Sequence, residues 1–337
     1  MPLTASRGCH QAPGVTGLRR EAGWLAGVAA VLLGVATACQ SSSPSSPTTT
    51  VPPSARLGAV LAPDPAHHDL LFFGGRAAGA VEGDTWLWTA GRWSRVKTPA
   101  APPARSFAAA ASDGRGGVIL FGGDPADPDG THDDTWRWNG SAWSALHPRT
   151  VPDAGAYRVM APGPSGGPVL VVFGADHQVR TWTWNAGAPD GGDWRAAAAA
   201  TAPPWRDAAG LAMDPQSHRL ILVGGVSAQG APAGDTWAWD GSTWSELHPA
   251  HRPAGGPASL TELGTGPLLY EQDGTWAWNG ADWTLQQQPG QPPWQAYPAL
   301  AGIPGASPGE LLAVLVTGPA GDQSQTWRWN GFGWNVA

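Results

Sequence analysis

The sequence predicts an all-β domain built as a six-bladed β-propeller, with four antiparallel strands in each blade. Two observations predict this fold: a tryptophan-rich phrase that recurs six times, and an apolar run of strand-forming residues that precedes it. The composition agrees, because 47 glycines, 34 prolines and only 13% charged residues suit short strands and tight turns better than exposed helices.

The recurring phrase is Thr-Trp-x-Trp, followed by a short turn and a third tryptophan. Its copies lie roughly 50 residues apart and contain all but three of the 21 tryptophans. Side chains alternate along a strand, so Trp-x-Trp places two indoles on one face. Regular repetition favours packing between blades over a platform for stacking carbohydrate. The copies begin at Thr85, Thr135, Thr181, Thr236, Thr275 and Thr326.

Apolar runs come before the phrase and end in Gly-Gly in three clear cases, 70–75, 118–123 and 220–225. A continuous apolar run is typical of a strand that is covered on both faces. Weaker strands precede these runs, for example at 105–111 and 208–213. After the phrase, Asn-Gly or Asp-Gly pairs such as those at 139–140 and 240–241 supply a hairpin turn, so each repeat predicts four strands.

These repeats resemble those of the kelch family over residues 54–337. The resemblance depends on the apolar strand that ends in Gly-Gly and on the spaced aromatics that follow a variable loop. The chain departs from the pattern at Gly174-Ala175, Tyr270-Glu271 and Thr317-Gly318, which replace the glycine pair. Tryptophan also stands where kelch motifs often have tyrosine. The resemblance implies a propeller, and because the sequence shows no Ser-His-Asp, metal-hydrolase or phosphate-loop motif, we favour a binding role.

We expect the ring to close without the exchange of a strand between the first and last blades. The first repeat begins with its own weak strand near Leu57, and the last ends with Trp334 on its fourth strand. Each blade is then complete in sequence, and closure depends on packing between the faces of the two terminal blades.

Residues 1–38 are typical of an export signal, because two arginines precede an apolar run over 24–36. That run is shorter than the roughly 20 residues that span a bilayer. The sequence Ala36-Thr37-Ala38-Cys39 is similar to the lipobox of bacterial lipoproteins, which implies lipidation of Cys39. Cleavage after Ala38 that leaves a free thiol is the alternative.

Residues 39–53 are rich in serine, threonine and proline and predict a flexible tether between the membrane and the domain. We therefore expect an extracytoplasmic protein that is lipid-anchored in the cell membrane or secreted.

Charge and cysteine content exclude several classes of function. The formal net charge is −7 and Lys97 is the only lysine, so the dense positive charge that nucleic-acid binding needs is missing. The two cysteines, Cys9 and Cys39, precede the predicted domain, which leaves it without a disulfide, a thiolate metal site or a cysteine nucleophile. We expect no cofactor and no metal.

Two families of propeller enzymes are the alternatives to a binding protein. Galactose oxidase has kelch blades and a copper centre with a tyrosine–cysteine crosslink, whereas this domain has no cysteine and only Tyr157, Tyr270 and Tyr297. Sialidases carry Asp-boxes, which 240–244 and 273–276 only approximate. A hydrolase or oxidase with an unrecognised site stays the main alternative, and a structural envelope protein is a third.

The predicted partner is a protein or a carbohydrate, bound by loops on one face of the propeller. Chain direction reverses at each strand, so connections between second and third strands share a face with the links between blades. That face collects the long loops, including an acidic one at 124–133 that we interpret as solvated rather than as a calcium site. Solvent-exposed spacers are the alternative interpretation of these loops. The candidate ligand contacts are Arg105, Trp205, Arg206, Trp294, Asp129 and His132, and no residue is assigned as catalytic.

The repeated Asp-Thr-Trp sequence has a separate interpretation. We expect Asp84, Asp134 and Asp235 to accept hydrogen bonds from backbone amides where the loop meets the third strand.

Overall fold

The computed structural model describes residues 52–337 except 78, 125–126, 128–132, 154, 156, 287–291, 294–297, 306–309 and 318–322, and only the backbone of 311–317 and 323. The predicted export signal, most of the tether and the predicted lipidation site Cys39 lie outside the described residues.

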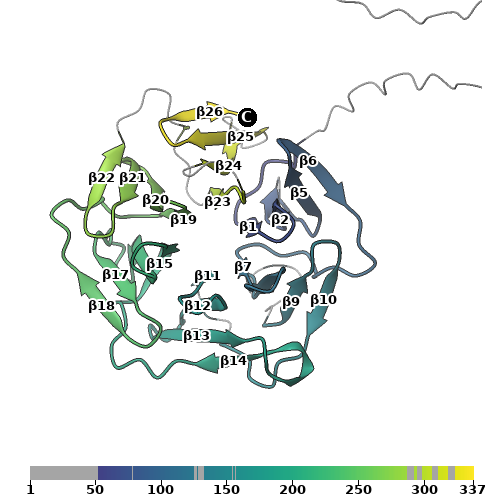
Figure 1. The fold of residues 1–337 in the computed structure, drawn as a ribbon, viewed down its shortest axis with the longest axis horizontal. Coiled ribbons are helices and arrows are strands. Elements are labelled where there is room, and N and C mark those ends of the chain that lie inside the picture. The colour runs from purple at the N-terminus through teal and green to yellow at the C-terminus, as the bar shows by residue number, and fades with distance from the viewer. Residues whose placement is uncertain are drawn as a thin grey trace, which may run out of the picture. The chain divides into compact units, whose positions relative to one another are not determined.

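Four-stranded antiparallel sheets surround a common axis, and six such sheets follow one another within the described residues (Figure 1). The first sheet contains β1 (Val60–Asp64), β2 (Asp69–Phe73), β5 (Thr85–Thr89) and β6 (Arg92–Val96). Strands of the first five sheets are described with their side chains, whereas β24 in the sixth is described mainly by its backbone. This arrangement confirms the predicted all-β propeller with four antiparallel strands in each blade.

The later sheets have the same order, from the axis outward. The second sheet contains β7 (Ala109–Ser112), β8 (Val118–Phe121), β9 (Thr135–Trp138) and β10 (Trp143–Leu146), and the third contains β11 (Tyr157–Pro162), β12 (Pro168–Phe173), β13 (Val179–Asn185) and β14 (Asp193–Ala196). The fourth sheet contains β15 (Arg206–Asp214), β16 (Arg219–Ser227), β17 (Thr236–Trp239) and β18 (Trp244–Leu247), and the fifth contains β19 (Ser259–Leu263), β20 (Gly266–Glu271), β21 (Gly274–Trp278) and β22 (Trp283–Gln286). The sixth sheet contains β23 (Ala299–Gly302), β24 (Glu310–Thr317), β25 (Gln323–Asn330) and β26 (Trp334–Val336).

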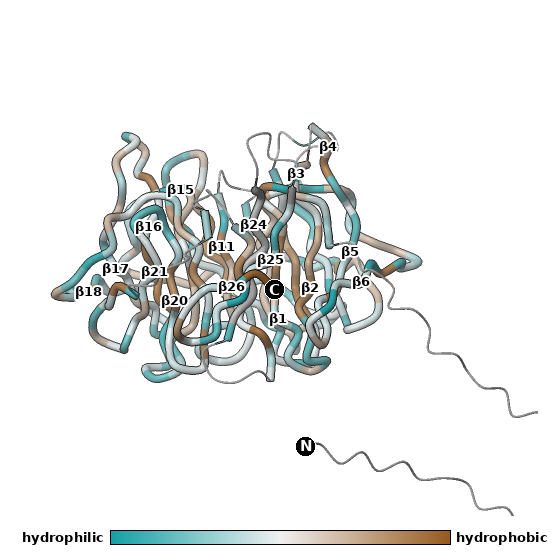
Figure 2. The backbone as a smooth tube through the Cα atoms, turned by 90° about the horizontal axis from the view of Figure 1, so that it is seen from above, coloured by the Kyte–Doolittle hydropathy of each residue, from teal (hydrophilic) through white to brown (hydrophobic). Residues whose placement is uncertain are grey.

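A short hairpin and a 3-10 turn lie outside the four-stranded sheets. The strands β3 (Arg76–Ala77) and β4 (Ala80–Val81) form a small hairpin between β2 and β5, and η1 (Pro189–Gly191) is a 3-10 turn between β13 and β14. In the side view the hairpin stands at one end of the propeller, and apolar stretches run along the strands inside it (Figure 2).

The first strand of each sheet lies nearest the axis, and these innermost strands contact one another in sequence around the ring. A contact between β23 and β1 completes the circle. Every four-stranded sheet in the described residues is built only from strands of its own repeat. The prediction that the ring closes without exchange of a strand is therefore confirmed.

The hydrophobic core lies between neighbouring blades. In β2, Leu71 and Phe73 pack against the second blade, whereas Leu70 and Phe72 pack in the cluster that includes Ala301 of the sixth. Alternate side chains of one strand thus face opposite neighbours. Because both faces are covered, the second strand of each blade must be apolar throughout, which explains the continuous apolar runs in the sequence.

The second and third tryptophans of each phrase form cross-strand pairs in this core. Trp239 pairs with Trp244, their ring centroids lie 5.4 Å apart, and both indoles are at most 1% exposed. Indole Nε1 of Trp244 donates a 2.9 Å hydrogen bond to Oγ1 of Thr181 in the preceding blade. Equivalent bonds join every neighbouring pair of blades, from Trp93 to Thr326, Trp143 to Thr85, Trp194 to Thr135, Trp283 to Thr236 and Trp334 to Thr275.

The first tryptophan of the phrase has a different environment. Trp237 is only partly buried, and its indole Nε1 donates a 2.6 Å bond to Asp235 instead of to another blade. The sequence-based assignment to the core therefore holds for the second and third tryptophans of each phrase. Among the first tryptophans it holds for Trp182, which is 9% exposed, and is too broad for the others, which are partly buried: Trp86, Trp136, Trp237, Trp276 and Trp327.

Candidate functional site

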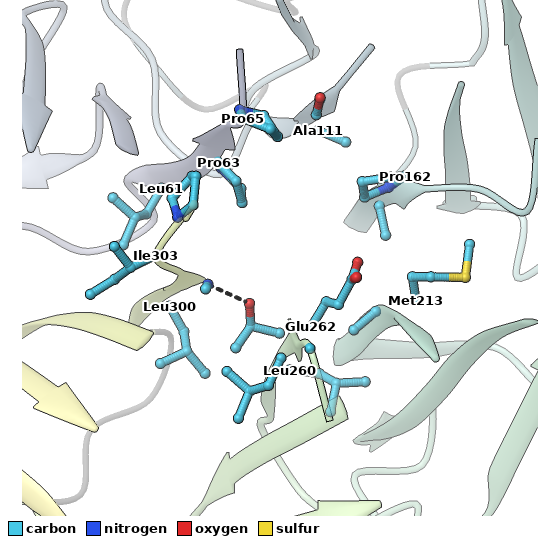
Figure 3. A pocket seen from close by; sticks show the side chains of 18 of the residues that line it. Leu61, Pro63, Pro65, Ala111, Pro162, Met213, Leu260, Glu262, Leu300 and Ile303 are labelled. Atoms are coloured by element: carbon cyan, nitrogen blue, oxygen red, sulfur yellow. Dashed lines mark hydrogen bonds between the residues drawn. The ribbon is translucent and has the colours of Figure 1, made fainter. Parts of the chain in front are cut away.

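A cavity of about 570 Å³ opens on the propeller axis, at the end where each first strand turns into the second (Figure 3). All six innermost strands contribute to its wall. This volume falls within the range of small-molecule binding sites, about 300–1,000 Å³. The wall is mainly aliphatic, and its larger side chains are Leu61, Met160, Leu211, Met213, Leu260, Leu300 and Ile303.

Small residues on the innermost strands leave this space open. The strand β7 reads Ala-Ala-Ala-Ser and β23 reads Ala-Leu-Ala-Gly, so several side chains that face the axis are too short to fill it. A smaller space of about 180 Å³, lined in part by the same strands, continues along the axis beyond Leu211 and Leu260. The sequence shows these small residues, but only their convergence around one axis makes a cavity.

One carboxyl group in the cavity wall has no salt bridge or hydrogen bond from the described residues. Glu262, on β19, points its carboxylate into the cavity near Met213, Pro162 and Leu260 (Figure 3). Burial, together with the negative charge of Asp214, raises the pKa of the Glu262 carboxyl above its usual range. Both causes disfavour a lone negative charge at this position.

The other acidic groups at this end of the axis have partners. Glu310 accepts a 2.5 Å bond from Arg328 on β25, and Asp113 accepts a 2.7 Å bond from Arg137 on β9. Asp214 is fully buried and accepts bonds from the amide of Gln216 and the hydroxyl of Ser217. Glu262 thus differs from its acidic neighbours in lacking a donor within the described chain.

Two predicted ligand contacts, Arg105 and Arg206, have buried side chains. Each is 1% exposed. Arg206 donates to both carboxylate oxygens of Asp235, at 2.6 and 2.7 Å, and to the carbonyl of Gly224. Arg105 makes the same contacts with Asp134 and the carbonyl of Gly122. Because both guanidinium groups are enclosed, they are not available as surface contacts in this structure, and we assign them to holding the loop against the link between blades.

The aspartates of the Asp-Thr-Trp sequence have these arginines and the first indole as partners. Burial by itself raises the pKa of Asp235, but hydrogen bonds from Arg206 and Trp237 outweigh it and hold that pKa below its usual value. Asp84 is held in the same way by Arg56 and Trp86. We expected these aspartates to accept hydrogen bonds from backbone amides, whereas the side chains that bond to Asp84 and Asp235 are an arginine and an indole. The arginine comes from a link that is distant in sequence, so local sequence does not reveal it.

Of the four remaining predicted ligand contacts, the structure describes only Trp205. Trp205 is partly buried, donates from indole Nε1 to the carbonyl of Gly174 at 2.8 Å, and lies 5.0 Å from the ring of His177. It packs between the third and fourth blades. Trp294, Asp129 and His132 lie outside the described residues.

The acidic loop is not fully solvated in its described part. Asp127 is 3% exposed, pairs with Arg76 at 2.7 Å and accepts a bond from the amide of Ser106. Within the part of the chain that the structure describes, no group of three or more histidine, cysteine or acidic residues is arranged to hold a metal ion.

The tyrosines considered for a copper centre also have structural partners where they are described. The hydroxyl of Tyr157 donates to the carbonyl of Ala209, and that of Tyr270 donates to the carbonyl of Pro292, both at 3.1 Å. Tyr297 lies outside the described residues.

Fold and cavity together define a β-propeller with a ligand-sized axial site. No protein-family model matches the chain, and a search of curated proteins found no similar protein. Among the residues with described structure, no helix is long and apolar enough to cross a membrane. The cavity itself was not predicted from the sequence, and it opens at the end opposite to the long loops that the sequence favoured.

Proposed function

We propose that this chain is an extracytoplasmic binding protein, tethered to the membrane through a lipid on Cys39, that receives its ligand in the axial cavity. The observation that carries the proposal is the cavity of about 570 Å³, walled by all six innermost strands. Buried tryptophans join the neighbouring sheets that carry this wall, and pre-formed, mostly apolar cavities are typical binding sites. The lipid and the tether are supported by Ala36-Thr37-Ala38-Cys39 and by residues 39–53.

A blocked cavity tests this function. Ala110 lies in the wall on β7, and Ala110→Phe would place a phenyl ring in the space. The matched control is Ala145→Phe on β10, an exposed position on an outermost strand. A compound library is screened by thermal shift against the wild type and both variants.

We expect some compounds to raise the melting temperature of the wild type and of Ala145→Phe, and not that of Ala110→Phe. If every stabilising compound acts equally on Ala110→Phe, the cavity is not the binding site. Chemical conversion of a bound compound would instead favour the alternative, a propeller hydrolase or oxidase.

A further inference from the structure

We propose that the axial cavity selects an organic cation: a ligand with a compact apolar body and a protonated amine that donates hydrogen bonds to Glu262. This inference depends on the function proposed above and names the chemical class of its ligand. It follows from the charge balance of the cavity, from the shape of its wall and from the position of the carboxylate.

The Glu262 carboxylate lies in an apolar part of the cavity wall. Glu262 is the fourth residue of β19, and its neighbours in the wall include Leu260 and Met213 from two adjacent blades. Figure 3 shows the carboxylate among apolar side chains, with open space in front of it. A carboxylate in such surroundings is unfavourable unless a donor or a positive charge compensates it. The protein therefore presents an acceptor that the cavity itself does not satisfy.

The arginines at this end of the cavity are already engaged, and the imidazole of His68 is the other basic group in its wall. At this end of the axis Arg137 pairs with Asp113, and Arg328 pairs with Glu310. Asp214 adds a further buried negative charge close enough to affect Glu262. Among the described residues no cation pairs with Glu262, so the electrostatic potential in the cavity favours a positive ligand and opposes an anionic one.

The wall specifies the rest of the ligand. Leucine, methionine, proline, isoleucine and alanine side chains make up most of the wall, and they offer dispersion contacts but no hydrogen bonds. The polar side chains in the wall are those of His68, Ser112, Thr261, Glu262 and Glu310. Thr261 in the same wall already accepts a 3.0 Å bond from the amide of Gly302. An apolar body fits this surface, and one ammonium group is sufficient to satisfy Glu262. Many-hydroxyl ligands such as sugars would leave most of their polar groups unpaired here.

The test compares two probes of the same shape, 1-adamantylammonium and 1-adamantanol, by titration calorimetry with the full chain at neutral pH. We expect the wild type to bind the ammonium about tenfold to hundredfold more tightly than the alcohol, because a hydrogen bond to a charged group is worth that much. Glu262→Gln should lose this preference and keep its affinity for the alcohol. Glu246→Gln, at an outer-strand position that does not line the cavity, is the matched control and should behave as the wild type.

Three results would overturn the inference: equal affinity of the wild type for both probes, an unchanged ammonium preference in Glu262→Gln, or no binding of either probe. None of these results by itself refutes the proposal that the cavity binds a ligand. That proposal fails only if no compound distinguishes the wild type from Ala110→Phe, so the two failures are separable.

Discussion

Indole Nε1 of Trp93 in the first blade donates a 3.0 Å hydrogen bond to Oγ1 of Thr326 in the last. The two residues are 233 positions apart in the chain, and the donor and the hydroxyl are both buried. The same bond recurs at the other blade interfaces, so the closing interface uses the contact that joins blades elsewhere. No shared strand is needed, because the terminal blades meet as any two neighbours do.

Breaking this bond should destabilise the ring. In Thr326→Val the indole of Trp93 loses its acceptor within the core, and an unsatisfied buried donor costs about 1–3 kcal/mol. Urea unfolding followed by tryptophan fluorescence measures the free energy of unfolding. Thr284→Val, at an exposed position on β22, is the control and should change stability by less than about 0.5 kcal/mol. Equal effects of the two variants would contradict the role of the bond.

The tryptophans of one phrase should differ in their contribution to stability. Trp239 is 0% exposed between two blades, so Trp239→Ala should cost about 3–5 kcal/mol. Trp237→Ala should cost less, because that indole is partly buried and bonds to Asp235 within its own blade. Parallel denaturant titrations compare the two free energies. A larger loss for Trp237→Ala would show that the first tryptophan of the phrase holds the blades together.

Arg206 should be a stability residue. Arg206→Ala removes both hydrogen bonds from the guanidinium to the Asp235 carboxylate and leaves that partly buried charge with no cation beside it, although the bond from Trp237 remains. Breaking a buried pair in this way costs about 3–5 kcal/mol. Arg195→Ala, at an exposed site on β14, should stay within about 0.5 kcal/mol of the wild type. Thermal melts of both variants are the measurement, and a mild effect of Arg206→Ala would return this residue to the candidate surface contacts.

Glu271 should make the fold less stable as pH rises. It is 2% exposed at a position where three other blades have Gly74, Gly122 and Gly224, and burial, aided by Asp273, raises its pKa from 4.5 to about 9. Between these values the folded protein keeps a proton that the unfolded chain has lost. The unfolded state therefore binds fewer protons, and the free energy of unfolding falls as pH rises through this window.

Glu271→Gln should flatten that dependence and raise the melting temperature most at the alkaline end. Melting temperatures measured from mildly acidic to alkaline pH give the comparison. The matched control is Glu246→Gln, because that carboxyl is exposed on the outermost strand β18. Parallel pH profiles for Glu271→Gln and the wild type would contradict the assignment.

Lipidation is tested at Cys39. Metabolic labelling with a fatty-acid analogue should tag the wild type and not Cys39→Ala, because the thiol of this residue is the predicted acylation site. Fractionation should move the variant from the membrane to the soluble fraction. Equal labelling of both proteins would refute the lipid anchor and favour ordinary cleavage after Ala38.

Sequence alone determined the features that depend on local order. The spacing in Trp-x-Trp, the Asn-Gly turns and the apolar runs such as 70–75 predicted the strands and their pairing, because strand alternation and turn geometry are set by adjacent residues. The repeat then predicted the blades. Ring closure followed as well, since every blade is complete within its own repeat.

Tertiary structure alone decided which polar residues are buried and where the cavity lies. Arg206 meets Asp235 across 29 positions of sequence, so its burial depends on a loop and a link that fold against each other. Glu262 faces a cavity made by six strands drawn from the whole domain. Burial and charge balance are sums over every neighbour in space, and a sequence shows only the neighbours along the chain.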